Sequence, residues 1–268
     1  MRYLNLFLLL LIFACANLPK EKLPQYELSL EKTVDSTYTS YHFSNTLKAP
    51  LRIWFESSDE ALNKEFAASN PILIPPMDDT TLLVDTSKKI AYTSVLGDPA
   101  QQSKATKVVL PFSTGRKFRL MQGYNSKPSH NTAYSRYALD FDLQVGDTIC
   151  AATDGFVVGV VEGYKDGGKR KKWRPYANFI TLFDPATALY TQYVHLDYMG
   201  SFVEVGDQVQ AGQAIAISGM TGYTTAPHLH FNVLRTIEGK KGMVSMPLDS
   251  IGSYKISELR RGQWLKNP

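Results

Sequence analysis

The chain has 268 residues, which is enough for one large domain or for two of moderate size. Its hydrophobic fraction of 44% and charged fraction of 20% are ordinary for a folded protein, and its 12% aromatic residues favour β-structure because they pack well on pleated surfaces. The net charge of +4 is too mild to indicate nucleic-acid binding, although it suits an anionic cell surface.

The first residues have the pattern of an export signal. A basic residue, Arg2, precedes a run at 4–13 that is apolar apart from one asparagine and too short to cross a bilayer as a helix, which takes about 20 residues. We predict that residues 1–16 are a signal peptide, with lipidation of Cys15 and attachment to a membrane. Plain secretion after cleavage within 14–16 is the alternative.

Residues 24–110 show short alternating apolar runs separated by turn residues, which is typical of a small β-sandwich. The runs at 51–55 and 107–110 are examples. We find no candidate metal cluster or nucleophile in this part of the sequence, and its one histidine, His42, is predicted to be an ordinary surface or packing residue.

From residue 111 the pattern changes, because glycine turns become frequent and the runs between them become strongly apolar. The run at 156–161 follows an Asp-Gly turn and is predicted to be a buried strand. A Val-Gly-Asp turn occurs twice, each time before a strand. We therefore predict an antiparallel β-core with few helices over residues 111–250, followed by a C-terminal tail at 251–268.

Two further features of this part have plain interpretations. Cys150 lies in an apolar run and is predicted to be a small core residue rather than a nucleophile or a ligand. The segment 163–177 is predicted to be a solvated surface loop, with an anion-binding lip beside an active site as the sharper alternative. Its spacing also mimics a phosphate-binding loop, but Arg170 stands where that motif needs Ser or Thr. The segment holds six cations, which are Lys165, Lys169, Arg170, Lys171, Lys172 and Arg174.

The most informative motif is a pair of histidines, His228 and His230, separated by one residue. Alternate residues of a β-strand share a face, so these two imidazoles point one way while Leu229 and Phe231 point into the core. Two imidazoles are costly to bury without partners, and a metal ion supplies such a partner.

A second cluster combines His130 with the alternating segment 137–142, in which Asp140 and Asp142 are expected on one face. One carboxylate with two imidazoles suits zinc, and three protein ligands leave a position open for water, as in catalytic zinc sites. His195, taken alone, reads as a packed or surface residue. Together with the other three histidines it is expected at the same site.

In this order the motifs resemble those of the M23, or lysostaphin-like, zinc peptidases. The resemblance covers about residues 110–234, and residues 96–99 resemble a subgroup with a β-sandwich before the catalytic domain. It implies an all-β fold, with an N-terminal β-sandwich and an antiparallel peptidase domain that has lipoyl-like half-barrel features. The motifs that carry it are His130, Tyr137-Ala138-Leu139-Asp140-Phe141, His195-Leu196, Ser218-Gly219-Met220-Thr221-Gly222 and Pro227-His228-Leu229-His230-Phe231.

The resemblance also implies roles for individual residues. One zinc ion is expected to be bound by His130, Asp140 and His230. The catalytic residues are expected to be His195 and His228, which would flank the attacking water.

Two further residues enter through the same resemblance. Asn178 resembles an asparagine that family members carry near the site. Nine residues, rather than the three of the compact family motif, separate His130 from Asp140, and this departure keeps Asp142 as an alternative ligand.

The implied activity is a zinc-dependent endopeptidase that cuts peptidoglycan peptides in stems or cross-bridges. The implied location is the bacterial cell envelope after export, either on a membrane facing the periplasm or secreted. A non-catalytic wall-binding or hydrolase-activating protein on the same fold is the alternative, although all five site positions are filled. A biotinyl or lipoyl carrier is disfavoured because the turn at 218–222 has no lysine, and the sequence motifs of thermolysin-like enzymes and of serine hydrolases are absent.

Overall fold

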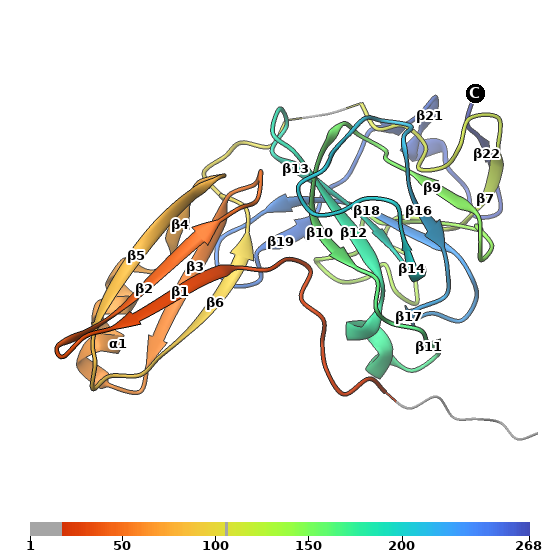
Figure 1. The fold of residues 1–268 in the computed structure, drawn as a ribbon. Helices are drawn as coiled ribbons and strands as arrows, with labels where there is room; N and C mark the ends of the chain where they lie inside the picture. Colours follow the sequence, from red (N-terminus) through yellow and green to blue (C-terminus); the bar gives the residue numbers. More distant parts are fainter. Residues whose placement is uncertain (1–17, 105–106) are drawn as a thin grey trace, which may run out of the picture.

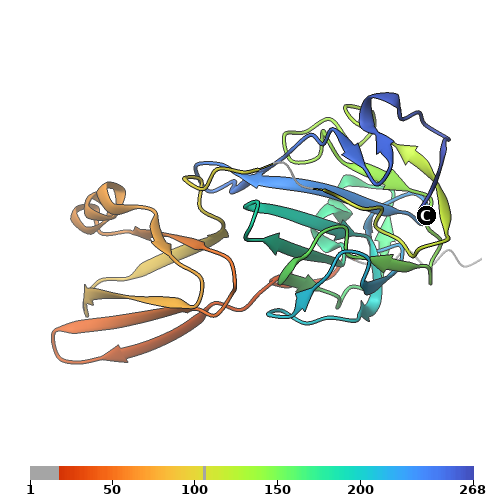
Figure 2. The ribbon, with the colours of Figure 1, turned by 90° about the horizontal axis from the view of Figure 1, so that it is seen from above.

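The computed structural model describes residues 18–104 and 107–268, which form two β-rich domains (Figure 1). The signal peptide predicted at 1–16, and Cys15 within it, lie outside the described residues. Within the described ranges, no helix combines the length and the apolar character needed to cross a bilayer. Seen from above, the N-terminal domain and the larger C-terminal domain stand next to each other along one axis (Figure 2).

The N-terminal domain consists of two three-stranded antiparallel sheets, in the orders β1-β2-β5 and β4-β3-β6. Side chains from both sheets, such as Phe43 and Ile53, fill one shared core, so the predicted β-sandwich is confirmed. The strands are β1 (Ser29–Val34), β2 (Tyr38–Asn45), β3 (Leu51–Ser57), β4 (Ile72–Ile74), β5 (Asp78–Asp85) and β6 (Ile90–Leu96).

This domain also contains an α-helix, α1 (Glu60–Ser69), which the sequence pattern did not reveal. The helix begins after Asp59, whose carboxylate accepts a hydrogen bond from the backbone N–H of Leu62 at 3.0 Å. Phe66 is its one buried residue, so the helix lacks the apolar stripe from which helices are recognised.

The C-terminal domain is built on a nine-stranded sheet in the order β15-β10-β12-β13-β18-β8-β7-β22, with β19 paired to β18. A small sheet, β14-β16-β9, packs on it over a common apolar core, and the described strands do not close into a barrel. The main strands are β7 (Lys117–Gln122), β8 (Leu139–Phe141), β10 (Gly155–Val161), β12 (Phe179–Asp184), β13 (Leu189–Val194), β15 (Gln208–Val209), β18 (Leu229–Thr236), β19 (Met243–Ser245) and β22 (Trp264–Lys266).

Shorter elements complete this domain. The small sheet consists of β9 (Thr148–Cys150), β14 (Leu196–Ser201) and β16 (Ala214–Ser218). Two-stranded pairs and short 3-10 helices lie at its margins. They are β11 (Gly167–Gly168) with β17 (Gly222–Tyr223), β20 (Ser250–Ile251) with β21 (Tyr254–Lys255), and the helices η1 (Lys171–Tyr176) and η2 (Ile256–Glu258).

The structure corrects two local predictions. Residues 107–110 form no strand, although Val108 and Leu110 are buried, because their backbone makes isolated hydrogen bonds to distant segments rather than a strand ladder. The N–H of Val109 donates to the Ala152 carbonyl at 2.9 Å, and the Val108 carbonyl accepts from the N–H of Gly252 at 2.7 Å. Residues 251–268 are not a free tail, since β22 pairs with β7 and buries Leu265. The prediction that 156–161 is a strand is confirmed by β10.

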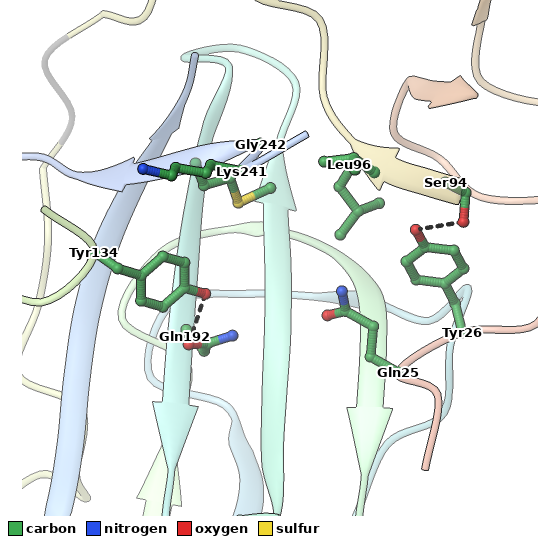
Figure 3. A pocket seen from close by; sticks show the side chains of 10 residues that line it. Gln25, Tyr26, Ser94, Leu96, Tyr134, Gln192, Lys241 and Gly242 are labelled. Atoms are coloured by element: carbon green, nitrogen blue, oxygen red, sulfur yellow. Dashed lines mark hydrogen bonds between the residues drawn. The ribbon is translucent and has the colours of Figure 1, made fainter. Parts of the chain in front are cut away.

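The two domains contact each other through both apolar and polar groups. Buried residues of the sandwich, such as Leu51, pack in one cluster with residues of the large sheet, such as Tyr190. Arg52, which is 1% exposed, donates from Nη1 to the carbonyl oxygen of Ile237 at 3.1 Å. A small crevice remains beside this contact. In it, Tyr26 and Ser94 lie opposite Tyr134 and Gln192 of the larger domain (Figure 3).

Candidate metal centre and substrate groove

Strand register brings the predicted site residues together. In the pairing of β18 with β8, His230 lies opposite Asp140, and in the pairing of β13 with β18 it lies opposite Val194. His195 directly follows β13. Three neighbouring strands of the sheet therefore supply or precede most of the candidate residues, although these lie up to 90 positions apart in the chain.

His130, Asp140 and His230 converge on one point. Asp140 Oδ1 lies 3.1 Å from His130 Nε2 and 2.8 Å from His230 Nδ1, and the two nitrogens are 3.3 Å apart. A tetrahedral zinc ion with bonds of about 2.1 Å has ligands about 3.4 Å apart, so this triangle needs only a small expansion to hold one. The three residues form a candidate metal-binding group.

The hydrogen bonds of His130 add a chemical reason for a cation at this point. Its Nδ1 lies 2.9 Å from the carbonyl oxygen of Gly123, and because a carbonyl only accepts, Nδ1 carries the proton. In the neutral ring, Nε2 then presents a lone pair to the carboxylate of Asp140. Two acceptors facing each other in a buried place require a positive ion or a proton between them, so the donor set fits a divalent metal.

The charges within this group are strongly coupled. Burial disfavours the carboxylate of Asp140, but the neighbouring charge of His230 and hydrogen bonds from both histidines outweigh it and hold its pKa well below the usual value. Burial also lowers the pKa of His130, but the carboxylate of Asp140 outweighs it and the net pKa is raised. For His230 burial dominates and the pKa is lowered.

His195 and His228 lie side by side next to this group. Their ring centroids are 4.6 Å apart, and Nε2 of His228 is 3.8 Å from Asp140 Oδ2. Each Nδ1 donates to a backbone carbonyl, at 2.7 Å to Thr221 for His195 and at 2.9 Å to Ala226 for His228. Both rings therefore keep Nε2 free to exchange a proton.

Local backbone structure explains how His195 reaches this position. Its φ of 71° lies in the left-handed region, which turns the chain sharply between β13 and β14. Burial, reinforced by the positive charges of His228 and His230, lowers the pKa of His195 to about 3. The ring is therefore neutral at neutral pH.

The alternation predicted around the histidine pair is confirmed. Leu229 and Phe231 are buried in the core, whereas His228 and His230 are partly exposed on the opposite face. Asp142, the alternative ligand, is not brought into the metal-binding group. It lies beyond the end of β8 and pairs with Arg119 at 2.5 Å.

Asn178 is fully buried and supports the site from behind. Its Nδ2 donates to the carbonyl oxygens of Tyr164 and Asp197 at 2.8 and 3.0 Å, and its Oδ1 accepts from the N–H of Tyr164 at 2.9 Å.

Thr221 is a further supporting residue, which the sequence pattern does not identify by itself. Its hydroxyl donates to the carbonyl oxygen of Leu196, next to His195, at 2.8 Å. The nearness of Asn178 and Thr221 to His195 depends on long-range contacts that no local pattern records.

A groove of about 580 Å³ opens over the metal-binding group. Its floor is formed by strands of the large sheet, and its sides come from the loop before β8, from η1 and from the segment after β17. Tyr134 Oη donates to Gln192 Oε1 at 3.1 Å, and this pair borders both the groove and the interdomain crevice (Figure 3). Residues that line the groove include Asp140, His195, His228, His230, Arg174, Tyr223 and Arg261.

The fold and the site define an all-β protein whose larger domain carries a His-Asp-His group and two further histidines over a groove. Residues 134–243 match the model of peptidase family M23, so the chain contains a peptidase M23 domain. Four of the five site residues lie within the match, whereas His130 precedes it by four positions, in the enlarged loop before β8.

Characterised relatives match the same region. The chain is 38% identical over 109 residues to the glycyl-glycine endopeptidase ALE-1 of Staphylococcus capitis, covering 41% of this chain and 27% of the relative. It is 30% identical over 149 residues to the peptidoglycan DD-endopeptidase ShyB of Vibrio cholerae, covering 53% and 32%. The chain thus spans about a third or less of the length of these relatives.

A solved structure is also similar in part. The catalytic domain of lysostaphin from Staphylococcus simulans shares 28% identity with the chain, with a TM-score of 0.34, over 48% of this chain and 87% of that domain.

Proposed function

We propose that this protein is a zinc-dependent endopeptidase that hydrolyses peptide bonds in peptidoglycan stems or cross-bridges. The observation that carries the proposal is the convergence of His130, Asp140 and His230 on one point beneath a groove, with two more histidines beside them. The M23 domain and the names of the relatives from Staphylococcus and Vibrio support the reaction and the substrate class.

His130, Asp140 and His230 would hold the zinc ion. When bound, the ion supplies Lewis-acid chemistry, which polarises the scissile carbonyl and lowers the pKa of a water molecule towards about 7. The carbonyl of Gly123 keeps the proton of His130 on Nδ1 and so directs the lone pair of Nε2 to the metal position.

His195 and His228 move the protons in this proposal. Nε2 of one ring takes the proton of the attacking water, and Nε2 of the other ring, once it has taken a proton from solvent, donates a hydrogen bond to the oxyanion that develops at the carbonyl. The proton is then passed to the departing amine. The carbonyls of Thr221 and Ala226 hold both rings in the tautomer that leaves Nε2 free, so neither ring has to flip during the reaction.

The chelator experiment tests the proposal directly. The purified chain is incubated with cross-linked muropeptides, with and without a chelator, and the products are read by mass spectrometry. We expect new free amine and carboxyl ends that disappear with chelator and return with added zinc. Absence of a chelator-sensitive product on every cross-linked peptide would overturn the peptidase proposal and favour a wall-binding or activating protein.

The same proposal places the protein in the bacterial cell envelope. Lipidation of Cys15 would anchor it to a membrane with both described domains outside the bilayer. Mass spectrometry of the protein purified from a membrane fraction tests this, since a mature chain that begins at an unmodified residue after Cys15 would support plain secretion instead.

A further inference from the structure

The segment between β10 and β12 is rich in cations, and Arg174, Pro175 and Ala177 of this segment line the groove. Six cations between β10 and β12 are exposed, and we call them the basic rim; they are Lys165, Lys169, Arg170, Lys171, Lys172 and Arg174. The same stretch holds two carboxylates, Glu162 and Asp166. Because the whole chain has a net charge of +4, the remainder of the protein is close to neutral.

The backbone that carries the basic rim is held firmly on the groove wall. β11 pairs in parallel with β17, and Trp173 is buried at the start of this wall. A Cβ atom added at Gly168 would lie 2.5 Å from Nε1 of Trp173, and one at Gly167 would lie 2.3 Å from the carbonyl oxygen of Met220. The backbone of this segment is thus close-packed at Gly167 and Gly168, while its cationic side chains are exposed to solvent.

The cations of the rim are left without acidic partners. None of the six forms an ion pair with a residue in the part of the chain that the structure describes. Arg174 lies over the ring of Tyr223, with its guanidinium carbon 5.7 Å from the ring centroid, and it lines the groove. Stacking on an aromatic ring limits the motion of a guanidinium but leaves its N–H groups free to donate.

A second cation reaches the groove from the other side. Arg261 precedes Gly262, whose N–H donates to the carbonyl oxygen of Leu120 in β7 at 2.8 Å. The strand beside Arg261, β7, and the strand that follows the basic rim, β12, are separated in the sheet by β8, β18 and β13. Arg261 and the basic rim therefore lie on opposite sides of the groove. Asp140 is the one acidic residue among those described that line the groove, and it belongs to the histidine group.

We propose that the basic rim and Arg261 select peptides that carry free carboxylates over uncharged peptides, glycine bridges included. This inference rests on the proposed endopeptidase function and adds the class of substrate. Guanidinium groups bind carboxylates with paired, charge-assisted hydrogen bonds, and a groove with cations at its edges raises the local concentration of an anionic ligand. With cations at two edges, the groove binds a peptide whose carboxylates lie on both sides of the scissile bond.

The test compares two versions of one cross-linked muropeptide, one with free carboxylates and one with the carboxylates amidated, together with a pentaglycine peptide. Hydrolysis is followed with the zinc-loaded protein, and binding of the same peptides is measured by calorimetry with chelator present, so that no turnover occurs. We expect kcat/KM for the free-carboxylate peptide to exceed that for the amidated one by at least about tenfold at low salt, and the ratio to fall as salt is raised.

Variants assign the preference to the named residues. Arg174→Gln and Arg261→Gln are each expected to reduce the ratio about threefold to tenfold, mainly through KM, and Arg174→Lys to restore part of it. Lys64→Gln, which removes an exposed cation of α1 in the other domain, is the matched control and should leave the ratio unchanged.

The outcomes separate the two proposals. Equal kcat/KM and equal affinity for free and amidated peptides would overturn the carboxylate inference while leaving the endopeptidase standing. Tighter binding of the free-carboxylate peptide without hydrolysis of any peptide would overturn the endopeptidase and support the recognition surface alone.

Discussion

Asn45 in the sandwich and Asp140 in the peptidase domain are both buried polar side chains on β-strands, but they are satisfied in opposite ways. The amide of Asn45 donates to the carbonyl oxygens of Ala49, Ile74 and Pro75, and its Oδ1 accepts from the N–H of Leu47. Every polar atom of that side chain thus has a backbone partner that belongs to the fold. Asp140 instead faces two imidazole nitrogens, and these three groups need a cation to be compatible.

The comparison separates structural from functional burial. Polar groups that close a hydrogen-bonding circuit with the backbone stabilise one conformation and leave nothing for a ligand. Buried acceptor groups that converge with their lone pairs on one point lower the stability of the folded chain unless a ligand binds there. Their presence therefore indicates a binding site. In the sandwich, Asn45 is a buried polar group paired with the backbone. The groove contains the converging groups, and Asn178, which is paired with the backbone, lies next to the segment that holds His195.

The largest expected effect comes from removing the charge at the centre of the metal-binding group. Asp140→Asn keeps the shape of the side chain, but we expect zinc affinity to fall by more than about 100-fold and hydrolysis to fall to the level seen with chelator. Metal content and muropeptide turnover measure the two effects. Asp142→Asn is the control, because that carboxylate is bound by Arg119 and should not alter zinc content. Full zinc occupancy in Asp140→Asn would contradict the assignment.

The next effect separates binding of the metal from catalysis. His228→Ala should retain zinc, since the three ligands are untouched, yet lose about 10²- to 10⁴-fold in kcat, as is typical for loss of a general acid or base. His42→Ala removes a histidine of the sandwich that bonds to Thr81 and should change nothing. Unchanged biological activity in the His228 variant would support a non-catalytic activator.

A third, smaller effect comes from comparing the loss of Asn45 in the sandwich with the loss of Asn178 beside the groove. Asn45→Ala and Asn178→Ala each leave several backbone groups without a partner and should each lower the free energy of unfolding by about 2–3 kcal/mol, measured by urea denaturation. Only Asn178→Ala should also reduce kcat, because its amide holds the carbonyl of Asp197 beside His195. Equal turnover in both variants would show that the support behind the groove is not needed for its geometry.

The smallest effect concerns the contact between the domains. Arg52→Met keeps the length and much of the apolar surface of a side chain that is 1% exposed, so we expect a loss of only about 1 kcal/mol from the bond to Ile237. Calorimetry should show whether the two domains still unfold in one transition. A loss of turnover in this variant would mean that the sandwich influences the groove, and the separation of a structural sandwich from a functional groove would then be wrong.

Local pattern was enough for much of the fold and for the chemical character of the site. The alternation at 228–231 placed two histidines on one face and two apolar residues in the core, because the period of a strand follows from its own backbone geometry. The same reasoning identified the sandwich and β10, and it identified Cys150 as a buried core residue. It missed α1, whose single buried residue leaves no stripe to read.

Other features were decided only by the tertiary structure. The choice between Asp140 and Asp142 depends on the register of β8 against β18, and pairing between distant strands is set by the whole core rather than by neighbouring residues. The tautomers of His130, His195 and His228 depend on carbonyls that no spacing in the chain predicts. These hydrogen-bond partners come from segments that are brought together only by folding. The residue type therefore determines which chemistry is possible, and the tertiary structure determines which nitrogen of each ring faces the site.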